Sequence, residues 1–559
     1  MLLSVVYQVA TMYVDTSYSN QRGRTYCRHL LRESYREAGK VKHRTLANLS
    51  HCTEEEIAAI KLALKHKSNL AELGTIEDVK TKQGMRIGAV FTLNALAERI
   101  GLPKVLGHHR EGRLALWQVL ARFIDQGSRL SAVRLAERHA ACDILGLDSF
   151  NEDHLYNNLA WLSGQQEVIE KRLFRKRYGN KTPQLFLYDV TSSYLEGVKN
   201  ILAAFGYNRD GKKGKMQLVI GLLTGAEGIP VAVRVFEGNT QDPKTISEQV
   251  HTLTSIFGVK EVTLVGDRGM IKQAQIDLLN DKGFHYITAI TKPQIRKLIS
   301  EGVFQMALFD EDICAVQWDG VRYILRCNPE RTRELARNRK DKLKKVKELL
   351  KEKNFYLAEH SRAKVEVARR NVKEKAKRLK IDDWITIVTN GRTLELIVDE
   401  EIKKHTAQLD GCYVIKSDLS EEIATAETIH ERYKDLAKVE RAFRTFKNGH
   451  LEVQPTFVRT GDSTRGHVFV VMLAYLLECE LDKYWRCLEI TVEEGIDELG
   501  SLRGVEMTIG KGTCQKVPEP TDLNKQLLDA VRIKLPTVLP LRKIHVATRK
   551  KLVSERKSL

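Results

Sequence analysis

The chain has 559 residues, more than the roughly 100–200 of one ordinary domain, so about two to four domains are expected. A hydrophobic fraction of 42% and a charged fraction of 29% exclude a disordered or membrane-embedded chain. Lys and Arg outnumber Asp and Glu by 91 to 72, which gives a net charge of +19. This surplus favours a polyanionic partner, most often nucleic acid, although ribosome-associated and membrane-surface proteins share it.

The first 14 residues are apolar but too short to span a bilayer, and no basic segment precedes the apolar run. They predict a β-strand, and neither a signal peptide nor a membrane anchor. The nine cysteines are scattered, with no Cys-x-x-Cys pair and no Cys/His cluster at the spacing of a zinc site. They predict reduced thiols, so we expect a cytoplasmic protein with no membrane partner.

A helical domain is predicted after a β-containing segment at residues 1–41. Residues 42–180 have apolar positions at helical spacing and several helix stop signals. Within them, a helix at residues 130–139, a turn near Gly146 and a second helix at 151–162 resemble a helix-turn-helix. A plain helical bundle fits this pattern equally well.

The pattern changes after Pro183 to short apolar runs separated by helical stretches. This alternation predicts an α/β sheet domain. The helices are expected at residues 244–257 and 271–282. The strands are expected at residues 184–190, 217–223, 231–236, 262–265 and 285–290.

A different composition begins near residue 294. Residues 294–425 contain further strand-like pieces around a long helical run at 330–380, in which Lys and Arg dominate. A solvated helix or helical hairpin is the simplest interpretation of most of these charges. Helical patterns return at 425–444 and 467–485, and the tail that follows is mixed and basic.

Two aspartates lie directly after apolar strands of the predicted sheet. Asp189 follows the run at 185–188, and Asp267 follows the run at 262–266. Strand ends in an α/β sheet open into the crevice where ligands bind. One such aspartate is usually a turn former or a helix cap, whereas two in the same domain favour a functional pair.

A third acidic candidate, Glu440, lies on a predicted helix. Steps of seven residues close to within about 20° of two full turns, so Tyr433, Glu440 and Lys447 are predicted on one face, with Arg444 beside them. The apolar residues on another face should pack on the sheet. The alternative is a surface pair between Glu440 and Arg444, which contributes roughly 0.2–0.5 kcal/mol.

The ordered string of motifs over about residues 180–480 resembles the DDE transposases of insertion sequences. More narrowly, it is similar to a subgroup with a β-rich insertion and a Y-R-E-K helix signature. Residues 31–42 also resemble one branch whose members begin near Met12, so residues 1–11 are expected to be an extension from an upstream start. The motifs lie at residues 188–194, 206–212, 217–223, 228–230, 236–242, 266–269, 409–413 and 433–447.

The resemblance implies an α/β fold with an RNase H-like catalytic core, which is interrupted by a β-rich insertion and preceded by a helical DNA-binding domain. We therefore expect the core at residues 181–293 and 426–490, the insertion with its charged helical run at 294–425, and a basic C-terminal region at 491–559.

The resemblance also implies a mechanism. Asp189 would bridge two Mg²⁺ ions, with Asp267 and Glu440 each completing one ion, and Mn²⁺ can substitute. Such a site would cut DNA at the transposon ends and join the ends to target DNA. Lys447 would contact a phosphate near the scissile bond, and Tyr433 would hydrogen-bond the DNA backbone.

Further DNA contacts are expected around the carboxylates. Arg268 directly follows Asp267 and is one candidate. Leu436 stands where the signature has an arginine, and Arg441 or Arg444 could take over the phosphate contact of that arginine. The expected partner is double-stranded DNA, as terminal inverted repeats and as target, bound by a homodimer on paired ends in the nucleoid.

A tryptophan of the insertion is expected to hold a flipped base. Relatives that form DNA hairpins move a base out of the stack, and a stacked aromatic ring stabilises it by about 1–3 kcal/mol. Trp318 precedes an Asp-Gly turn, which predicts an exposed hairpin tip, whereas Trp384 leads into an apolar strand and should be buried. A purely structural tryptophan is the alternative for both.

Two other functions stay open. An RNase H-like nuclease without strand transfer would use the same three carboxylates, and a non-catalytic DNA-binding protein derived from a transposase would need none of them. Retention of the carboxylates argues against the second function, and retention of the insertion argues against the first.

Overall fold

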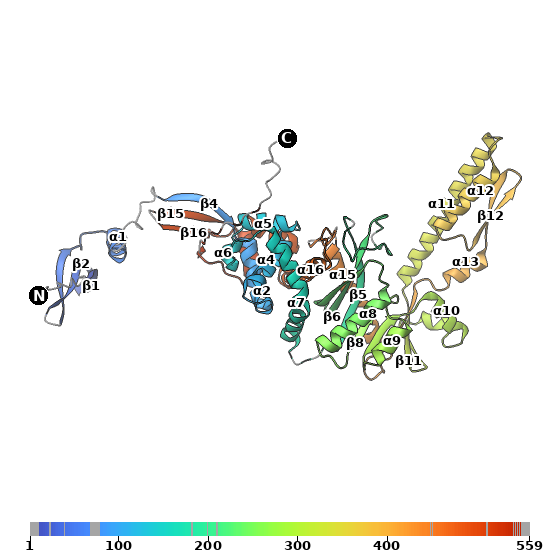
Figure 1. Cartoon of the computed structure of the whole chain (residues 1–559), viewed down its shortest axis with the longest axis horizontal. Helices are drawn as coiled ribbons and strands as arrows, with labels where there is room; N and C mark the ends of the chain where they lie inside the picture. Colours follow the sequence, from blue (N-terminus) through green and yellow to red (C-terminus); the bar gives the residue numbers. More distant parts are fainter. Residues whose placement is uncertain are drawn as a thin grey trace. The chain divides into compact units, whose positions relative to one another are not determined.

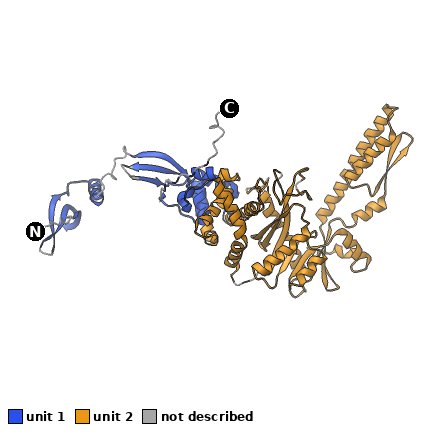
Figure 2. Cartoon of the chain, in the orientation of Figure 1, with its two compact units in different colours: residues 1–95, 133–150, 484–559 blue, residues 96–132, 151–483 orange. Residues whose placement is uncertain are grey.

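The computed structural model describes residues 11–539 except 22–23, 38–39, 68–78 and 510–511, and beyond 539 it describes 542, 544, 546 and 548. Single positions outside the description are 180, 182, 198, 208, 210, 448, 450 and 455. The first ten residues of the expected N-terminal strand therefore lie outside it. The chain forms two compact units, coloured in Figure 2, which consist of residues 1–95, 133–150 and 484–559, and of residues 96–132 and 151–483.

The first unit begins with a three-stranded antiparallel sheet and a helix, shown in blue in Figure 1. Thr53 caps this helix: its hydroxyl accepts from the Glu56 amide, and the Glu56 carboxylate accepts from the Thr53 amide. The described end of the expected first strand is confirmed. The elements are β1 (Thr11–Gln21), β2 (Arg24–Glu37), β3 (Lys40–Asn48) and α1 (Glu54–Lys65).

A second sheet of this unit joins residues from both ends of the chain. β4 (Lys80–Arg86) pairs with β15 (Arg503–Ile509), and the strand order is β17-β16-β15-β4. Residues 491–559, which the sequence predicts only as a basic C-terminal region, therefore contribute three strands to the sheet that contains β4. β4 is mostly exposed and shows no apolar alternation, so its sequence did not indicate a partner more than 400 residues away. The remaining elements are β16 (Gly512–Lys516), β17 (Val538–Leu539), α6 (Ala141–Leu145), α17 (Val492–Ser501), η5 (Arg486–Leu488) and α18 (Asp522–Ala530).

The expected helical domain is confirmed as helical beyond residue 87. Its longest helix, α7 (Glu152–Tyr178), has 27 residues and continues well past the predicted end at residue 162. Buried side chains occur along the whole of α7, from Leu155 to Phe174, which favours a packed helical bundle over a recognition helix. The other helices here are α2 (Gly88–Ile100), α3 (Leu102–Leu106), α4 (Arg110–Ile124), α5 (Arg129–Arg138) and, from later in the chain, α16 (Gly461–Trp485).

An eight-stranded sheet organises the second unit, in the order β10-β11-β14-β9-β8-β5-β6-β7. β5, β6 and β7 pair antiparallel, and β8 and β9 then follow parallel to β5. This arrangement is the expected RNase H-like core, and all five predicted strands are present. They are β5 (Leu185–Tyr194), β6 (Gln217–Gly225), β7 (Pro230–Glu237), β8 (Thr263–Gly266) and β9 (His285–Ala289).

The two faces of β5 meet different helices. Phe186, Tyr188 and Val190 alternate along the strand and join a core that includes residues of α7, α8 (Asp242–His251) and α9 (Gln273–Asn280). A π-helix, η3 (Thr252–Ile256), directly continues α8. The alternation places Asp189 on the opposite face, where α15 (Leu436–Lys447) packs on β5.

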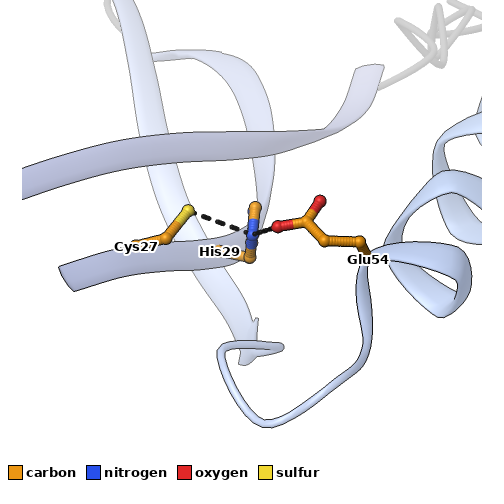
Figure 3. A group of neighbouring side chains, drawn as sticks. All are labelled: Cys27, His29 and Glu54. Carbon is orange, nitrogen blue, oxygen red and sulfur yellow. Dashed lines mark hydrogen bonds and ion pairs between the residues drawn. The ribbon is translucent and has the colours of Figure 1, made fainter. Parts of the chain in front are cut away.

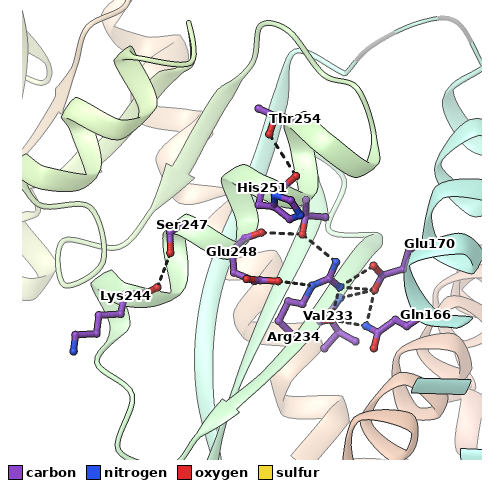
Figure 4. Close-up of polar contacts among 10 residues, drawn as sticks. Gln166, Glu170, Val233, Arg234, Lys244, Ser247, Glu248, His251 and Thr254 are labelled. Carbon is purple, nitrogen blue, oxygen red and sulfur yellow. Dashed lines mark hydrogen bonds and ion pairs between the residues drawn. The ribbon is translucent and has the colours of Figure 1, made fainter. Parts of the chain in front are cut away.

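Helix α7 is tied to β7 by a buried ion pair. The Glu170 carboxylate accepts two bonds from Arg234 Nη1, at 2.7 and 3.0 Å, and further bonds from Gln166 Nε2 and the Val233 amide (Figure 4). The Glu170 side chain is 0% exposed. Because the carboxylate is fully satisfied, the pair fixes the position of α7 on the core sheet.

The segment between Ser300 and Thr425 differs from the expected β-rich insertion. β10 (Cys314–Trp318), β11 (Val321–Cys327) and β14 (Cys412–Ser417) extend the core sheet beyond β9 and do not form a separate domain. More of the segment is helix than strand, because α11 alone has 31 residues. Helix α10 (Lys292–Ser300) precedes the segment. The other elements within it are η4 (Met306–Asp310), α11 (Pro329–Glu359), α12 (Val365–Arg378), β12 (Ile385–Asn390), β13 (Thr393–Val398) and α13 (Glu400–Ala407).

The charged run forms the predicted helical hairpin. α11 and α12 lie side by side with the β12–β13 hairpin against them (Figure 1), around a small apolar core that includes Val346, Val372 and Trp384. Only Val346 and Leu357 are buried in α11, so most of its charges are solvated, as predicted. Among the described helices, none combines the length and the apolar character needed to cross a bilayer.

Candidate active site

Asp189 lies in the middle of a strand that is otherwise almost entirely buried. β5 is long and apolar, and Asp189 is half-buried between the buried side chains of Tyr188 and Val190. The Val190 amide donates to Asp189 Oδ1 at 2.8 Å. The strand therefore holds this carboxylate in place on the face that α15 covers.

Asp267 is brought beside Asp189 by the parallel pairing of β8 with β5. The register places Gly266, the last residue of β8, opposite Tyr188, so Asp267, which directly follows β8, comes beside Asp189 on β5. The chain turns sharply there, because the Met270 amide donates to the Asp267 carbonyl at 2.9 Å. Asp267 and Arg268 are exposed at this turn, as the strand-end argument predicts.

Glu440 comes from helix α15, which packs on β5. Its buried residues are Val439, Ala442, Phe443 and Phe446, and these form the expected apolar face. Glu440 is exposed and precedes Arg444 by one helical turn. Three different elements, β5, the turn after β8 and α15, thus contribute one carboxylate each.

The three carboxylates share one electrostatic environment. Burial raises the pKa of Asp189 from 3.8 to about 7, and the charges of Asp267 and Glu440 act in the same direction. The Val190 amide and the charge of Arg209 oppose this rise. Within the described part of the chain, the three carboxylates are not part of a group whose ligand atoms all lie within 4.8 Å of one another. The charges of Asp267 and Glu440 nevertheless reach Asp189 and oppose its ionisation.

The predicted helix over 425–444 is broken at Asp435. α14 (Ala426–Lys434) ends there, and α15 begins at Leu436. Asp435 suits a helix end because its side chain competes for backbone groups, and here it pairs with Lys438 Nζ at 2.8 Å. The prediction of one continuous helix was therefore wrong at Asp435, although the charge of Glu440 still acts on Tyr433 across the break.

Tyr433 reaches the site in spite of this break. Its hydroxyl donates to Asp267 Oδ1 at 3.2 Å. Burial and the nearby Asp267 charge raise its pKa well above the ordinary value, so the phenol stays protonated and keeps its role as a donor. In this structure Tyr433 orients a carboxylate, and its expected contact with the DNA backbone stays a prediction.

The basic candidates do not all face the carboxylates. The charge of Arg268 opposes the rise in the pKa of Tyr433, which places it at the site. Arg441 instead opposes the rise in the pKa of Tyr475 on α16. Arg444 and Lys447 follow Glu440 by four and seven residues on α15, so they share its face. Arg444 is thus better placed than Arg441 to replace the arginine expected at Leu436.

One residue near the carboxylates was assigned no role from the sequence. Arg209 lies in the quoted motif at 206–212, pairs with the Asp242 carboxylate at the start of α8, and acts electrostatically on Asp189. The motif was a usable signal. The local sequence of residues 206–212 did not indicate that this segment would return to β5 and lie near Asp189.

Trp318 has the predicted exposure and is distant from the carboxylates. It is 44% exposed and precedes a turn in which Asp319 and Gly320 have φ of 49° and 73°, whereas Trp384 is 2% exposed as predicted. Trp318 lies on the edge strand β10, with four strands between it and β5. At about 4.8 Å per strand, it is about 24 Å from Asp189. The structure does not bring Trp318 to the site.

The raised pKa of Asp189 predicts a stability cost. Its pKa in the folded chain, about 7, exceeds the ordinary 3.8, so the folded chain loses stability as pH rises from 4 to 7. Asp189→Asn removes this cost. At pH 8 in EDTA the variant should exceed the wild type in unfolding free energy, on the order of 2 kcal/mol, with the difference vanishing near pH 4. Urea unfolding at both pH values tests this, and a pH-independent difference would count against it.

Family comparisons match most of the chain. The model described as Transposase DDE domain matches residues 180–477, and the model described as IS1634 family transposase, N-terminal domain, matches residues 14–80. No curated protein matches the chain. A solved structure of a piggyBac transposase synaptic complex with hairpin DNA aligns at 8% identity and a TM-score of 0.32, over 75% of this chain and 69% of that chain. Because the first family model alone covers more than half of the residues, the chain belongs to the DDE transposases of insertion sequences.

Proposed function

We propose that Asp189, Asp267 and Glu440 are the metal-binding carboxylates with which this DNA transposase cuts its transposon ends and joins them to target DNA. The observation that carries the proposal is the convergence of three carboxylates from β5, the β8 turn and α15, where burial raises the pKa of Asp189 to about 7 and the charges of Asp267 and Glu440 add to the rise. Structural carboxylates are seldom arranged so that they oppose one another's ionisation.

The donor set fits hard divalent cations. All three side chains offer carboxylate oxygens, the ligands that Mg²⁺ and Mn²⁺ prefer, and the charges of Asp267 and Glu440 both act on Asp189. A pair of ions would neutralise the charges that oppose each other, activate a nucleophile and stabilise the leaving oxygen. Asp267 and Glu440 need not touch, since each would complete a different ion.

The surrounding residues would orient these ligands and the DNA. Tyr433 holds Asp267 through its hydroxyl at 3.2 Å, and Arg209 opposes the charge of Asp189. Lys447 and Arg444, on the face of Glu440, are placed to contact phosphates beside the scissile bond. Arg268, at the exposed turn after Asp267, supplies a further phosphate contact.

Other parts of the chain would also bind DNA, and two copies of the chain would form a homodimer on paired transposon ends. The net charge of +19 and the solvated Lys and Arg of α11 supply a surface for the phosphate backbone of the terminal inverted repeats and the target. Each copy would hold one transposon end, so that both ends take part in a concerted cut-and-paste reaction. A dimer that forms only with end DNA in size-exclusion chromatography would support this arrangement.

End binding is expected to weaken steeply with salt. If six or more phosphates are contacted, affinity should fall about 10³-fold between 50 and 200 mM salt, because each contact releases counterions. Fluorescence anisotropy of a labelled end measures the slope of log affinity against log salt. Lys345→Gln, on the exposed surface of α11, should make this slope shallower by up to about 1 if that helix binds DNA. A flat response in the wild type would rule out a phosphate-dominated interface.

Cleavage of the element's own ends tests the proposed reaction. The full chain is incubated with a labelled end and with Mg²⁺, Mn²⁺ or Ca²⁺, and the products are separated on a denaturing gel. We expect cleavage at the transposon boundary with Mg²⁺ or Mn²⁺ and binding alone with Ca²⁺. Cleavage in EDTA, or cuts unrelated to the boundary, would contradict the proposal. Cutting without any joined product would favour the nuclease alternative.

A further inference from the structure

A cysteine, a histidine and a glutamate converge in the N-terminal sheet, far in sequence from the proposed catalytic residues (Figure 3). Cys27 Sγ lies 3.2 Å from His29 Nε2, and Glu54 Oε1 lies 3.5 Å from the same nitrogen. Their three ligand atoms lie within 4.8 Å of one another, and within the described residues they form the one such group of Cys, His, Asp or Glu.

Local structure explains the convergence. Cys27 and His29 are two residues apart on β2, so both side chains point to one face of the sheet. The chain after β3 returns to this point, where the Leu49 amide donates to the His29 carbonyl at 2.8 Å and the His29 amide donates to Ser50 Oγ. The capping box at Thr53 then begins α1, which places Glu54 in its first turn.

The hydrogen bonds of His29 distinguish an ion site from a nucleophilic triad. In a Cys-His-carboxylate triad the thiol and the carboxylate use opposite ring nitrogens. Here both approach Nε2, while Nδ1 lies 3.0 Å from Thr16 Oγ1 on the neighbouring strand. A proton on Nδ1 donated to Thr16 leaves the Nε2 lone pair for a metal, which is how a second residue usually orients a ligand histidine.

The distances match the edges of a tetrahedral site. Zinc bonds of about 2.3 Å to sulfur and about 2.0–2.2 Å to nitrogen or oxygen place neighbouring ligand atoms about 3.4–3.6 Å apart. The observed separations of 3.2 and 3.5 Å require only small movements. The mixed thiolate, imidazole and carboxylate donors favour Zn²⁺ over Mg²⁺, which prefers oxygen ligands alone.

The subdomain around the cluster has very little apolar core. Among described residues between 11 and 67, Ile57 is the one buried apolar side chain, and His29 is the one buried polar side chain. A segment of this size with so small a core usually depends on a metal, disulfides or a partner for stability. We infer that Cys27, His29 and Glu54 bind one Zn²⁺ ion, which stabilises the N-terminal subdomain by joining α1 to β2.

Cobalt substitution in the full chain tests the assignment independently of the catalytic carboxylates, which include no thiol. We expect one thiolate-bound Co²⁺ per chain, seen as a thiolate-to-cobalt charge-transfer band and tetrahedral visible bands that Zn²⁺ abolishes. Cys27→Ser should lose the charge-transfer band. Cys52→Ser, which removes a thiol of the same subdomain outside the cluster, should keep it. No thiolate band in the wild type, its persistence in Cys27→Ser, or its equal loss in Cys52→Ser would overturn the assignment.

Two further variants separate metal binding from folding. Glu54 is exposed, so Glu54→Gln should leave the fold intact and lower Zn²⁺ affinity at least about tenfold. Thr16→Val removes the partner of His29 Nδ1 and should lower Zn²⁺ affinity about 10–100-fold.

Hydrogen exchange of the full chain tests whether the ion stabilises this segment. Zn²⁺ should slow amide exchange in residues 11–65 of the wild type and not in Cys27→Ser. Equal exchange with and without Zn²⁺ would contradict a stabilising ion.

Discussion

Asp189→Asn, Asp267→Asn and Glu440→Gln should each lower end cleavage at least about a thousandfold while leaving end binding nearly unchanged. Each substitution preserves side-chain shape and removes one charged oxygen ligand, so the variant loses affinity for the divalent ions and keeps the basic DNA surface. Rates are measured on a labelled end under single-turnover conditions at saturating Mg²⁺, and binding is measured by anisotropy with Ca²⁺.

The matched control for these variants is Asp281→Asn, an exposed aspartate of the same unit that lies after α9 and away from the cluster. It should cleave at the wild-type rate. Wild-type cleavage by any of the three substituted enzymes would remove that residue from the site, and parallel loss of binding would indicate a structural role.

Glu170→Ala should produce the largest loss of stability. The substitution removes the two bonds that Glu170 accepts from Arg234, whose side chain is 11% exposed in the intact pair, and leaves the arginine with the 3.7 Å ion pair to Glu248. Breaking a buried pair in this way costs about 3–5 kcal/mol. Urea unfolding of the full chain should show a correspondingly lower midpoint.

Two variants check that the ion pair causes this loss. Glu167→Ala changes an exposed glutamate of the same helix and should alter stability by less than about 0.5 kcal/mol. The double variant Glu170→Leu and Arg234→Met replaces both charges with apolar groups and should recover much of the loss. A Glu170→Ala midpoint equal to that of Glu167→Ala would mean that the pair contributes nothing to stability.

The core and its carboxylates were predictable because their signals are local. Apolar runs of strand length bounded by turn residues indicated β5 to β9, and the position of Asp267 followed from where its run ends. The expectation that Asp189 also follows a strand end was wrong, because β5 continues to Tyr194 and Asp189 lies within it. The amphipathic pattern of α15 indicated which side of the helix carries Glu440. Once these strands are predicted, the parallel pairing of β5 with β8 is enough to bring the two aspartates together.

The remaining features depend on contacts between residues distant in sequence or on the capping of a helix end. β4 is too polar to indicate a strand, and it is ordered by pairing with β15 from the other end of the chain. The break at Asp435 depends on local capping, which helical periodicity does not reveal. The Cys27 and His29 pair was overlooked because its carboxylate partner, Glu54, lies on a different element and follows no zinc-finger spacing.

Strand transfer by a pre-cut end tests the proposed active site most directly. A labelled end that already carries a free 3′ hydroxyl is incubated with the full chain, a supercoiled plasmid and Mg²⁺, and joined products are resolved on agarose and sequenced. The wild type should join the end to the plasmid, with short target duplications between paired insertions, and Asp189→Asn should join none. Joining by Asp189→Asn at the wild-type rate, or plasmid nicking by the wild type without joining, would contradict the proposed transposase site.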